Sequence, residues 1–133
     1  MYSRFMNDEN IKNILYIDLS SLDTSKVTDM RSMFHGISSL ITLDLSSFDT
    51  SNVTEMRDMF SLDYRDIPED KLETIYVNND FNTAKLKYFL RMFSNRKKLR
   101  GGNGSYLADP SDADKTWLRV DRPGVQGYFT RKS

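Results

Sequence analysis

The stretch LDLSSFDTSNVTEMRDMF, residues 43–60, has a near copy earlier in the chain. Residues 17–34, IDLSSLDTSKVTDMRSMF, match it at 13 of 18 aligned positions and precede it by 26 residues. Self-similarity at a fixed period of about 20–50 residues is the sequence signature of repeat architectures. The pair therefore predicts a fold built from stacked copies of one small unit.

Each copy combines two hydrophobic periods. Leu43 and Leu45 alternate with polar residues, which is typical of a short, half-buried strand. The apolar residues of 53–60 instead fall at positions i, i+3, i+6 and i+7, which predicts one face of a short helix. The DTSN segment between them is rich in residues that form turns and cap helices. The helical positions are Val27, Met30, Met33 and Phe34 in the first copy and Val53, Met56, Met59 and Phe60 in the second.

A third, diverged copy follows at residues 75–100, where FNT at 81–83 replaces FDT at 48–50. The segment SLDYRDIPEDK, residues 61–71, is longer than its counterpart in the preceding copy and predicts a protruding loop. The strand and helix positions of the third copy are Ile75, Val77, Leu86, Phe89, Met92 and Phe93.

Stacking of the copies is expected because each unit is too small to bury its own apolar face. We predict an α/β repeat: a short right-handed solenoid with one strand and one helix per repeat, and parallel strands about 4.8 Å apart. The solenoid would span residues 1–100 and a C-terminal loop with a β-hairpin cap residues 101–133. The predicted units are a partial repeat at 1–16 and repeats at about 17–42, 43–74 and 75–100.

The two ends of the chain differ. At the C-terminus, Pro123-Gly124 lies between two strand-like runs and predicts the turn of the cap hairpin. Trp117, Val120, Tyr128 and Phe129 would cover the last repeat. The N-terminus instead begins inside a repeat with no evident cap, which predicts an exposed edge. We therefore expect the C-terminal portion of a longer protein, or self-association through this uncapped edge.

Composition excludes several classes of function. Lys and Arg equal Asp and Glu at 19 each, so no overall field directs the chain to nucleic acid. No apolar run is long enough for membrane insertion, and the chain shows no signal peptide or anchor. The absence of cysteine excludes disulfides and thiol chemistry. His35 is the single histidine, so we predict a protein that is not an enzyme and needs no cofactor or metal.

The repeat with its linker GISSLIT, residues 36–42, resembles the repeats of about 25–26 residues in BspA-type leucine-rich repeat proteins of bacterial surfaces. Related repeats occur in mycoplasma lipoproteins. TIYVNNDFNTAKL at 74–86, and LRGGNG, ADKTWLRVD and GYFT further on, resemble the terminal part of such repeat regions. The resemblance covers roughly residues 14–130. It implies a cell-surface or secreted protein that acts in adhesion or partner binding.

The outward side chains of the predicted strands form the first candidate site. Alternation places polar side chains in columns across neighbouring strands, and tyrosine adds a rigid, amphipathic contact area. We predict that this strand face binds the partner, the alternative being a solvated sheet face. The columns are Tyr16, Thr42 and Thr74; Asp18, Asp44 and Tyr76; and Ser20, Ser46 and Asn78.

A basic segment is the second candidate. Residues 85–100 contain no acidic residue, which indicates binding of a polyanion such as a sulfated glycan. The alternative is a solvated helix face balanced by the acidic residues of 63–73. The basic residues are Lys85, Lys87, Arg91, Arg96, Lys97, Lys98 and Arg100.

The recurrent acidic residues are interpreted as structural. Asp18 and Asp44 would lie about 5 Å apart on neighbouring strands, where a cation, water or backbone hydrogen bonds relieve their repulsion. Asp23, Asp49 and Asn82 follow the strands and are expected to accept hydrogen bonds from turn amides.

The sequence thus predicts a non-enzymatic surface module that mediates adhesion or protein or glycan binding through its strand face. The partner would be a protein or glycoprotein, or a polyanionic glycan. The alternative is a structural spacer or capping segment of a longer surface array, with no ligand of its own.

Overall fold

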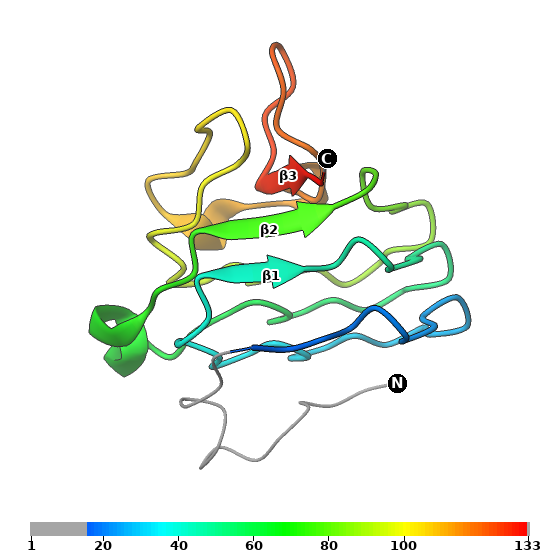
Figure 1. Cartoon of the computed structure of the whole chain (residues 1–133), viewed down its shortest axis with the longest axis horizontal. Coiled ribbons are helices and arrows are strands. Elements are labelled where there is room, and N and C mark those ends of the chain that lie inside the picture. Colours follow the sequence, from blue (N-terminus) through cyan, green and yellow to red (C-terminus); the bar gives the residue numbers. More distant parts are fainter. Residues whose placement is uncertain (1–15, 133) are drawn as a thin grey trace.

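A computed structural model describes residues 16–132 (Figure 1). Three short parallel strands form one sheet in the order β1-β2-β3, and the register pairs Thr42 with Thr74 and Ile75 with Phe129. The first two strands fall on the predicted strand positions of the second and third copies, which confirms those positions. The strands are β1 (Thr42–Asp44), β2 (Thr74–Val77) and β3 (Phe129–Arg131).

The first copy does not contribute a strand. Residues 17–19 lie beside β1, and Ser47 Oγ donates a hydrogen bond of 3.0 Å to Leu19 O, but the segment is not part of the sheet. The strand predicted there is therefore missing. The partial repeat predicted at 1–16, and the uncapped edge that it would form, lie almost wholly outside the described residues.

Short 3-10 helices are the helical elements of the described chain. The predicted loop 61–71 carries η1 and projects beyond the N-terminal ends of β1 and β2 in Figure 1. The other two belong to the C-terminal segment. Their bounds are η1 (Tyr64–Glu69), η2 (Pro110–Asp112) and η3 (Lys115–Trp117).

The prediction of helices at 27–34, 53–60 and 86–93 is wrong. These segments consist of turns and of parallel bridges that join Asp29 to Glu55 and Glu55 to Tyr88. Ser32, Asp58 and Arg91 have φ values of 56°, 57° and 58°, which a right-handed helix does not contain. The apolar spacing is satisfied by turns that repeat within each copy.

Every second backbone amide of the first two segments bonds to a carbonyl of the next copy, whereas amides such as those of Met33 and Met59 close turns within their own copy. Hydrophobic spacing predicted helices here because it indicates which side chains are buried, but not to which carbonyl each backbone amide donates. The bonds of 2.7–3.2 Å run from Met30, Ser32, Phe34 and Gly36 to the carbonyls of Glu55, Arg57, Met59 and Ser61, and from Met56, Asp58, Phe60 and Leu62 to those of Tyr88, Leu90, Met92 and Ser94. We call these segments the turn ladder; it stacks the three copies.

An aromatic column fills the core between the sheet and the turn ladder. Phe34, Phe60 and Phe93, equivalent residues of the three copies, stack with ring centroids 5.7 and 5.1 Å apart and interplanar angles of 7° and 10°. Tyr128 continues the column 4.7 Å from Phe93, and Trp117 lies 4.7 Å from Tyr128. All five side chains are buried. The expectation that C-terminal aromatic residues cover the last repeat is confirmed.

The C-terminal segment is nevertheless not a simple hairpin. The predicted turn exists, since Arg122 and Val125 form an antiparallel bridge around Pro123-Gly124, and Gly124 has a φ of 81°. However, β3 pairs in parallel with β2 and extends the sheet. In this position Phe129 is fully buried, and its ring lies 4.7 Å from that of Phe81.

Two threonines link the copies at equivalent turns, Thr24 in the first copy and Thr50 in the second. Thr24 Oγ1 donates to Asp49 O and accepts from Asp49 N–H, at 3.0 and 2.8 Å. Thr50 makes the same pair of bonds with Asn82, at 3.2 and 2.9 Å. Both threonines are buried, so these bonds are shielded from water.

Thr50→Val should lower the free energy of unfolding by about 1–2 kcal/mol, because it leaves the backbone N–H and C=O of Asn82 without their partner. The midpoint of urea unfolding measures this loss. Thr42→Val, at an exposed position of β1, is the matched control and should change stability by less than about 0.5 kcal/mol. Equal midpoints for the two variants would contradict the structural role of Thr50.

Candidate functional site

The outer face of the sheet is built by the alternation of its strands. Leu43, Ile75 and Phe129 point inward and are buried, which confirms the inward side of the predicted alternation. The register then brings Asp44 beside Tyr76, and Tyr76 beside Thr130. We call the outward residues Thr42, Asp44, Thr74, Tyr76 and Thr130 the sheet face.

The remaining residues of the three predicted columns lie around the sheet face. Asn78 Nδ2 donates to Ser46 O at 2.8 Å, so these neighbours meet at the C-terminal ends of β1 and β2. Tyr16 lies on the other side and is 77% exposed. Ser20 donates its N–H and its hydroxyl to Asp18, at 3.0 and 2.7 Å. Some polar groups of these outer residues are thus already engaged in hydrogen bonds within the protein.

Asp18 and Asp44, the two carboxylates that were expected to repel each other, each accept hydrogen bonds within the protein. Partial burial raises the pKa of Asp44, but hydrogen bonds from Lys132 and Ser46 outweigh it and place the pKa below its ordinary value. Lys132 Nζ lies 2.6 Å from Asp44 Oδ2. The hydroxyl and backbone amide of Ser20 lower the pKa of Asp18. Sequence reasoning missed Lys132, because β3 was not expected to join the sheet.

The recurrent turn residues Asp23, Asp49 and Asn82 accept hydrogen bonds from turn amides, as predicted. Asp23 accepts a hydrogen bond from Ser25 N–H at 2.9 Å, Asp49 from Ser51 N–H at 3.0 Å, and Asn82 Oδ1 from Ala84 N–H at 3.0 Å. These side chains therefore stabilise the turns between strand and turn ladder. Their recurrence has a structural cause.

The structure divides the basic segment into parts. Lys85 donates to Asn52 Oδ1 at 2.8 Å, and Arg91 lies 3.4 Å from Asp58 Oδ2 on the turn ladder. Lys87, also exposed, lies in the same part of the ladder, where its N–H donates to Thr54 O. Arg100 lies elsewhere, since its N–H donates to Glu73 O at the start of β2.

Arg96 corrects the basic candidate site most clearly. Its side chain is 1% exposed, and its Nη1 lies 2.8 Å from Asp70 Oδ1, whose side chain is 2% exposed. Its Nε and Nη2 donate to the carbonyls of Phe60 and Phe34. Arg96 therefore cannot contact an external polyanion, and its prediction as a binding residue is wrong. The interior holds it because it satisfies carbonyls from two earlier copies.

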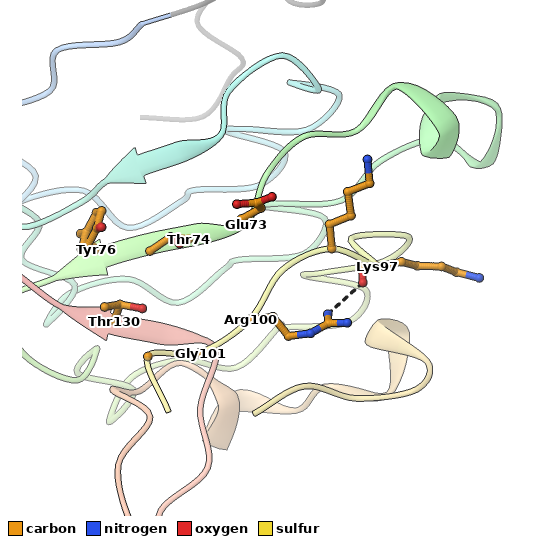
Figure 2. Close-up of a pocket in the computed structure, with 9 residues that line it drawn as sticks. Glu73, Thr74, Tyr76, Lys97, Arg100, Gly101 and Thr130 are labelled. Carbon is orange, nitrogen blue, oxygen red and sulfur yellow. Dashed lines mark hydrogen bonds between the residues drawn. The ribbon is translucent and has the colours of Figure 1, made fainter. Parts of the chain in front are cut away.

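A shallow pocket of about 550 Å³ joins the sheet face to the exposed end of the basic segment. Figure 2 shows Thr74, Tyr76 and Thr130 on the strands, and Lys97 and Arg100 on the segment that passes the start of β2. We call this hollow the β2 pocket. Its lining residues are Glu73, Thr74, Tyr76, Lys97, Lys98, Arg100, Gly101, Gly102 and Thr130.

Arg100 is fixed in place beside the β2 pocket. Its guanidinium carbon lies 3.9 Å from the centroid of the Tyr106 ring. Its Nη1 donates to the carbonyls of Lys97 and Leu99, both at 2.9 Å. This positive charge is therefore held at the pocket, and Arg100 forms no ion pair within residues 16–132.

His35 lies in a serine, histidine and aspartate arrangement on the turn-ladder side. Its Nδ1 is 2.5 Å from Ser61 Oγ, and its Nε2 is 3.4 Å from Asp63 Oδ1. Ser61 is only 2% exposed, and its hydroxyl lies 3.2 Å from the carbonyl of Asp58. A nucleophile needs access to its substrate, and the serine of this arrangement is buried.

Residues 16–132, the part of the chain that the structure describes, also bear on metal binding and membrane insertion. No group of three or more His, Cys, Asp and Glu side chains in this part of the chain could hold a metal ion. Within the same residues, no helix has the length and apolar character needed to cross a membrane.

The chain was compared with protein families, curated proteins and solved structures. Residues 1–113 match the family described as "Mycoplasma protein of unknown function, DUF285". Neither the curated proteins nor the solved structures gave a significant match. Because the family match spans most of the 133 residues, the chain belongs to the Mycoplasma family DUF285.

Proposed function

We propose that this protein is a non-enzymatic repeat module that binds a macromolecular partner through its sheet face, at a cell surface or after secretion. The observation that supports the proposal is the sheet register, which holds Asp44, Tyr76 and Thr130 side by side on the outer face. The partner would be a protein or a glycoprotein.

The scaffold favours recognition of this kind because hydrogen bonds order both the sheet and the turn ladder. The strands are paired in parallel, and the turn ladder bonds each copy to the next at 2.7–3.2 Å. Side chains on such a frame lose little freedom when a partner binds, which lowers the entropic cost of association. Tyr76 adds an aromatic ring of the type that is enriched at binding hot spots.

The architecture that we propose is a short leucine-rich-repeat-like solenoid. Stacked copies with parallel strands support it, as does the resemblance of residues 36–60 to BspA-type repeats. The same resemblance supports adhesion at a cell surface, because the proteins that carry such repeats are surface proteins.

A second candidate function is that of a spacer or capping segment. It is favoured by the C-terminal aromatic residues, since Trp117 and Tyr128 cover Phe93 at the end of the aromatic column. It is also favoured by Asp44, which is already engaged by Lys132. A module of this kind would terminate a surface array and bind nothing itself.

Tyr76→Thr should separate the two functions. We expect it to weaken binding to immobilised matrix glycoproteins by about tenfold or more, because it removes an aromatic contact at the centre of the sheet face. Surface plasmon resonance measures the affinity, and circular dichroism checks that the fold is kept. Threonine retains β-propensity, so the strand should remain intact.

The matched control is Tyr88→Thr, which removes a tyrosine that is 52% exposed on the turn ladder. It should leave binding unchanged. Equal effects of the two variants, or no binding by the unmodified protein, would favour the spacer function instead.

A further inference from the structure

We infer that the β2 pocket is a subsite for an acidic glycan and receives a sulfate or carboxylate group of a sugar chain. This inference rests on the proposed function, because the pocket forms one end of the sheet face. It adds the chemical class of the ligand to the surface already described.

Charge is the first argument. Lys97, Lys98 and Arg100 line the pocket, with Glu73 as the one acidic residue among the lining residues. Lys97 and Lys98 are exposed, and neither forms an ion pair within residues 16–132. Three cations around one hollow produce a local positive potential even though the chain as a whole has no net charge.

The chemistry of the lining is the second argument. The sheet side presents the hydroxyl groups of Thr74, Tyr76 and Thr130, and no aliphatic side chain lines the pocket. Apolar side chains dominate most sites for drug-like ligands, so this lining favours a polar ligand. Hydroxyl groups both donate and accept hydrogen bonds, as the hydroxyl groups of a sugar do.

The shape of the pocket is the third argument. At about 550 Å³ it has the size of a small-molecule site, but it is shallow and follows the surface. Gly102 allows the chain to pass close to β3 at the edge of the pocket, because a Cβ at this position would lie 3.3 Å from the Thr130 side chain. An extended chain of sugars can lie along a surface of this kind and place one charged group in the hollow.

The geometry of the cations favours an anion bound mainly by charge. Arg100 already uses Nη1 for two carbonyls and stacks on Tyr106, so its two-pronged approach to a carboxylate is restricted. Lysine acts as a flexible point charge that does not demand planar geometry. This arrangement suits the tetrahedral sulfate group as well as a carboxylate.

The experiment uses the full chain and a heparin hexasaccharide, with affinity measured by isothermal titration calorimetry at low and at physiological salt. We expect Lys97→Gln/Lys98→Gln to weaken binding by about tenfold or more. The control, Lys85→Gln/Lys87→Gln, changes the net charge equally on the turn ladder and should weaken binding by less than about threefold. Equal losses would overturn the inference, since they would show attraction to charge without a site.

Glu73→Gln gives a test of opposite sign. Removing the acid from the pocket should tighten heparin binding by about two- to fivefold. Asp58→Asn, on the turn ladder, removes the same charge away from the pocket, and asparagine tolerates the positive φ of that position. A tightening by Asp58→Asn as large as that by Glu73→Gln would count against the pocket.

Other probes distinguish the source of the charge and the class of ligand. Retained binding of hyaluronan and desulfated heparin would assign the site to sugar carboxylates, and loss of both to sulfates; either result supports the inference. No binding of any glycan, or tighter binding of polyglutamate or single-stranded DNA, would overturn it. If Tyr76→Thr still abolished glycoprotein binding, the proposed function would survive that failure.

Discussion

We expect Arg96→Met to lower the free energy of unfolding by about 3–5 kcal/mol, because it leaves the carboxylate of Asp70 buried without its cation. Burial lowers the pKa of Arg96, and Asp70 offsets part of this effect. Asp70 Oδ2 has no hydrogen-bond partner within the described residues, so the ion pair is its main compensation. The substitution also removes the hydrogen bonds that Arg96 donates to the carbonyls of Phe60 and Phe34.

Urea unfolding followed by circular dichroism measures this change. Lys98→Met is the matched control, since it removes an exposed cation two residues away and should alter stability by less than about 0.5 kcal/mol. Arg96→Met/Asp70→Leu removes both buried charges and should recover part of the loss. A single-variant loss below about 1 kcal/mol would mean that water reaches the pair and screens it.

Phe60→Ala should lower the free energy of unfolding by about 3–5 kcal/mol, through lost apolar burial and the cavity that remains. The ring is fully buried and stacks between Phe34 and Phe93, so one substitution removes both contacts at the centre of the aromatic column. Neighbouring copies cannot close the gap easily, because the turn ladder fixes their spacing.

Chemical denaturation again provides the measurement, with Phe48→Ala as the control. Phe48 is only partly buried and lies 6.2 Å from Phe34, at the side of the column. Its loss should reduce stability by about 1–2 kcal/mol, in proportion to the smaller area buried. Similar losses at the two positions would contradict a central role for the stacked rings.

The two variants with the largest expected effects on stability, Arg96→Met and Phe60→Ala, affect residues that are in direct contact. Arg96 Nε donates to the backbone carbonyl of Phe60, so the guanidinium is bonded to the residue whose ring the other variant removes. Residues in direct contact rarely show additive effects on stability. We therefore expect the combined loss in Phe60→Ala/Arg96→Met to differ from the sum of the single losses.

Much of the fold follows from local patterns. The near-identity of residues 17–34 and 43–60 predicted the stacking of the copies, and Leu43 and Ile75 lie inward as the alternation requires. Turn-forming residues such as Asp49 accept hydrogen bonds from nearby backbone amides, as their residue type suggested. These features depend on short stretches of chain, which is why sequence patterns capture them.

The errors arise where a pattern allows two backbone structures. Val53, Met56, Met59 and Phe60 are all buried, as predicted, yet their segment is a row of turns and not a helix. In this segment Asp58 adopts a φ of 57°, and its N–H bonds to Leu90 O in the next copy. Hydrophobic spacing does not distinguish these bonds from those within a helix.

The sequence by itself determined the repeat, the inward side of β1 and β2, and the aromatic cover at the C-terminus, because these depend on residue type and local order. Tertiary structure alone decided which charges are available. It buries Arg96 against Asp70, brings Lys132 to Asp44 across 88 residues, and gathers Lys97 with Thr130 at one pocket. Such meetings depend on how distant segments pack, and a linear pattern of charges does not contain that information.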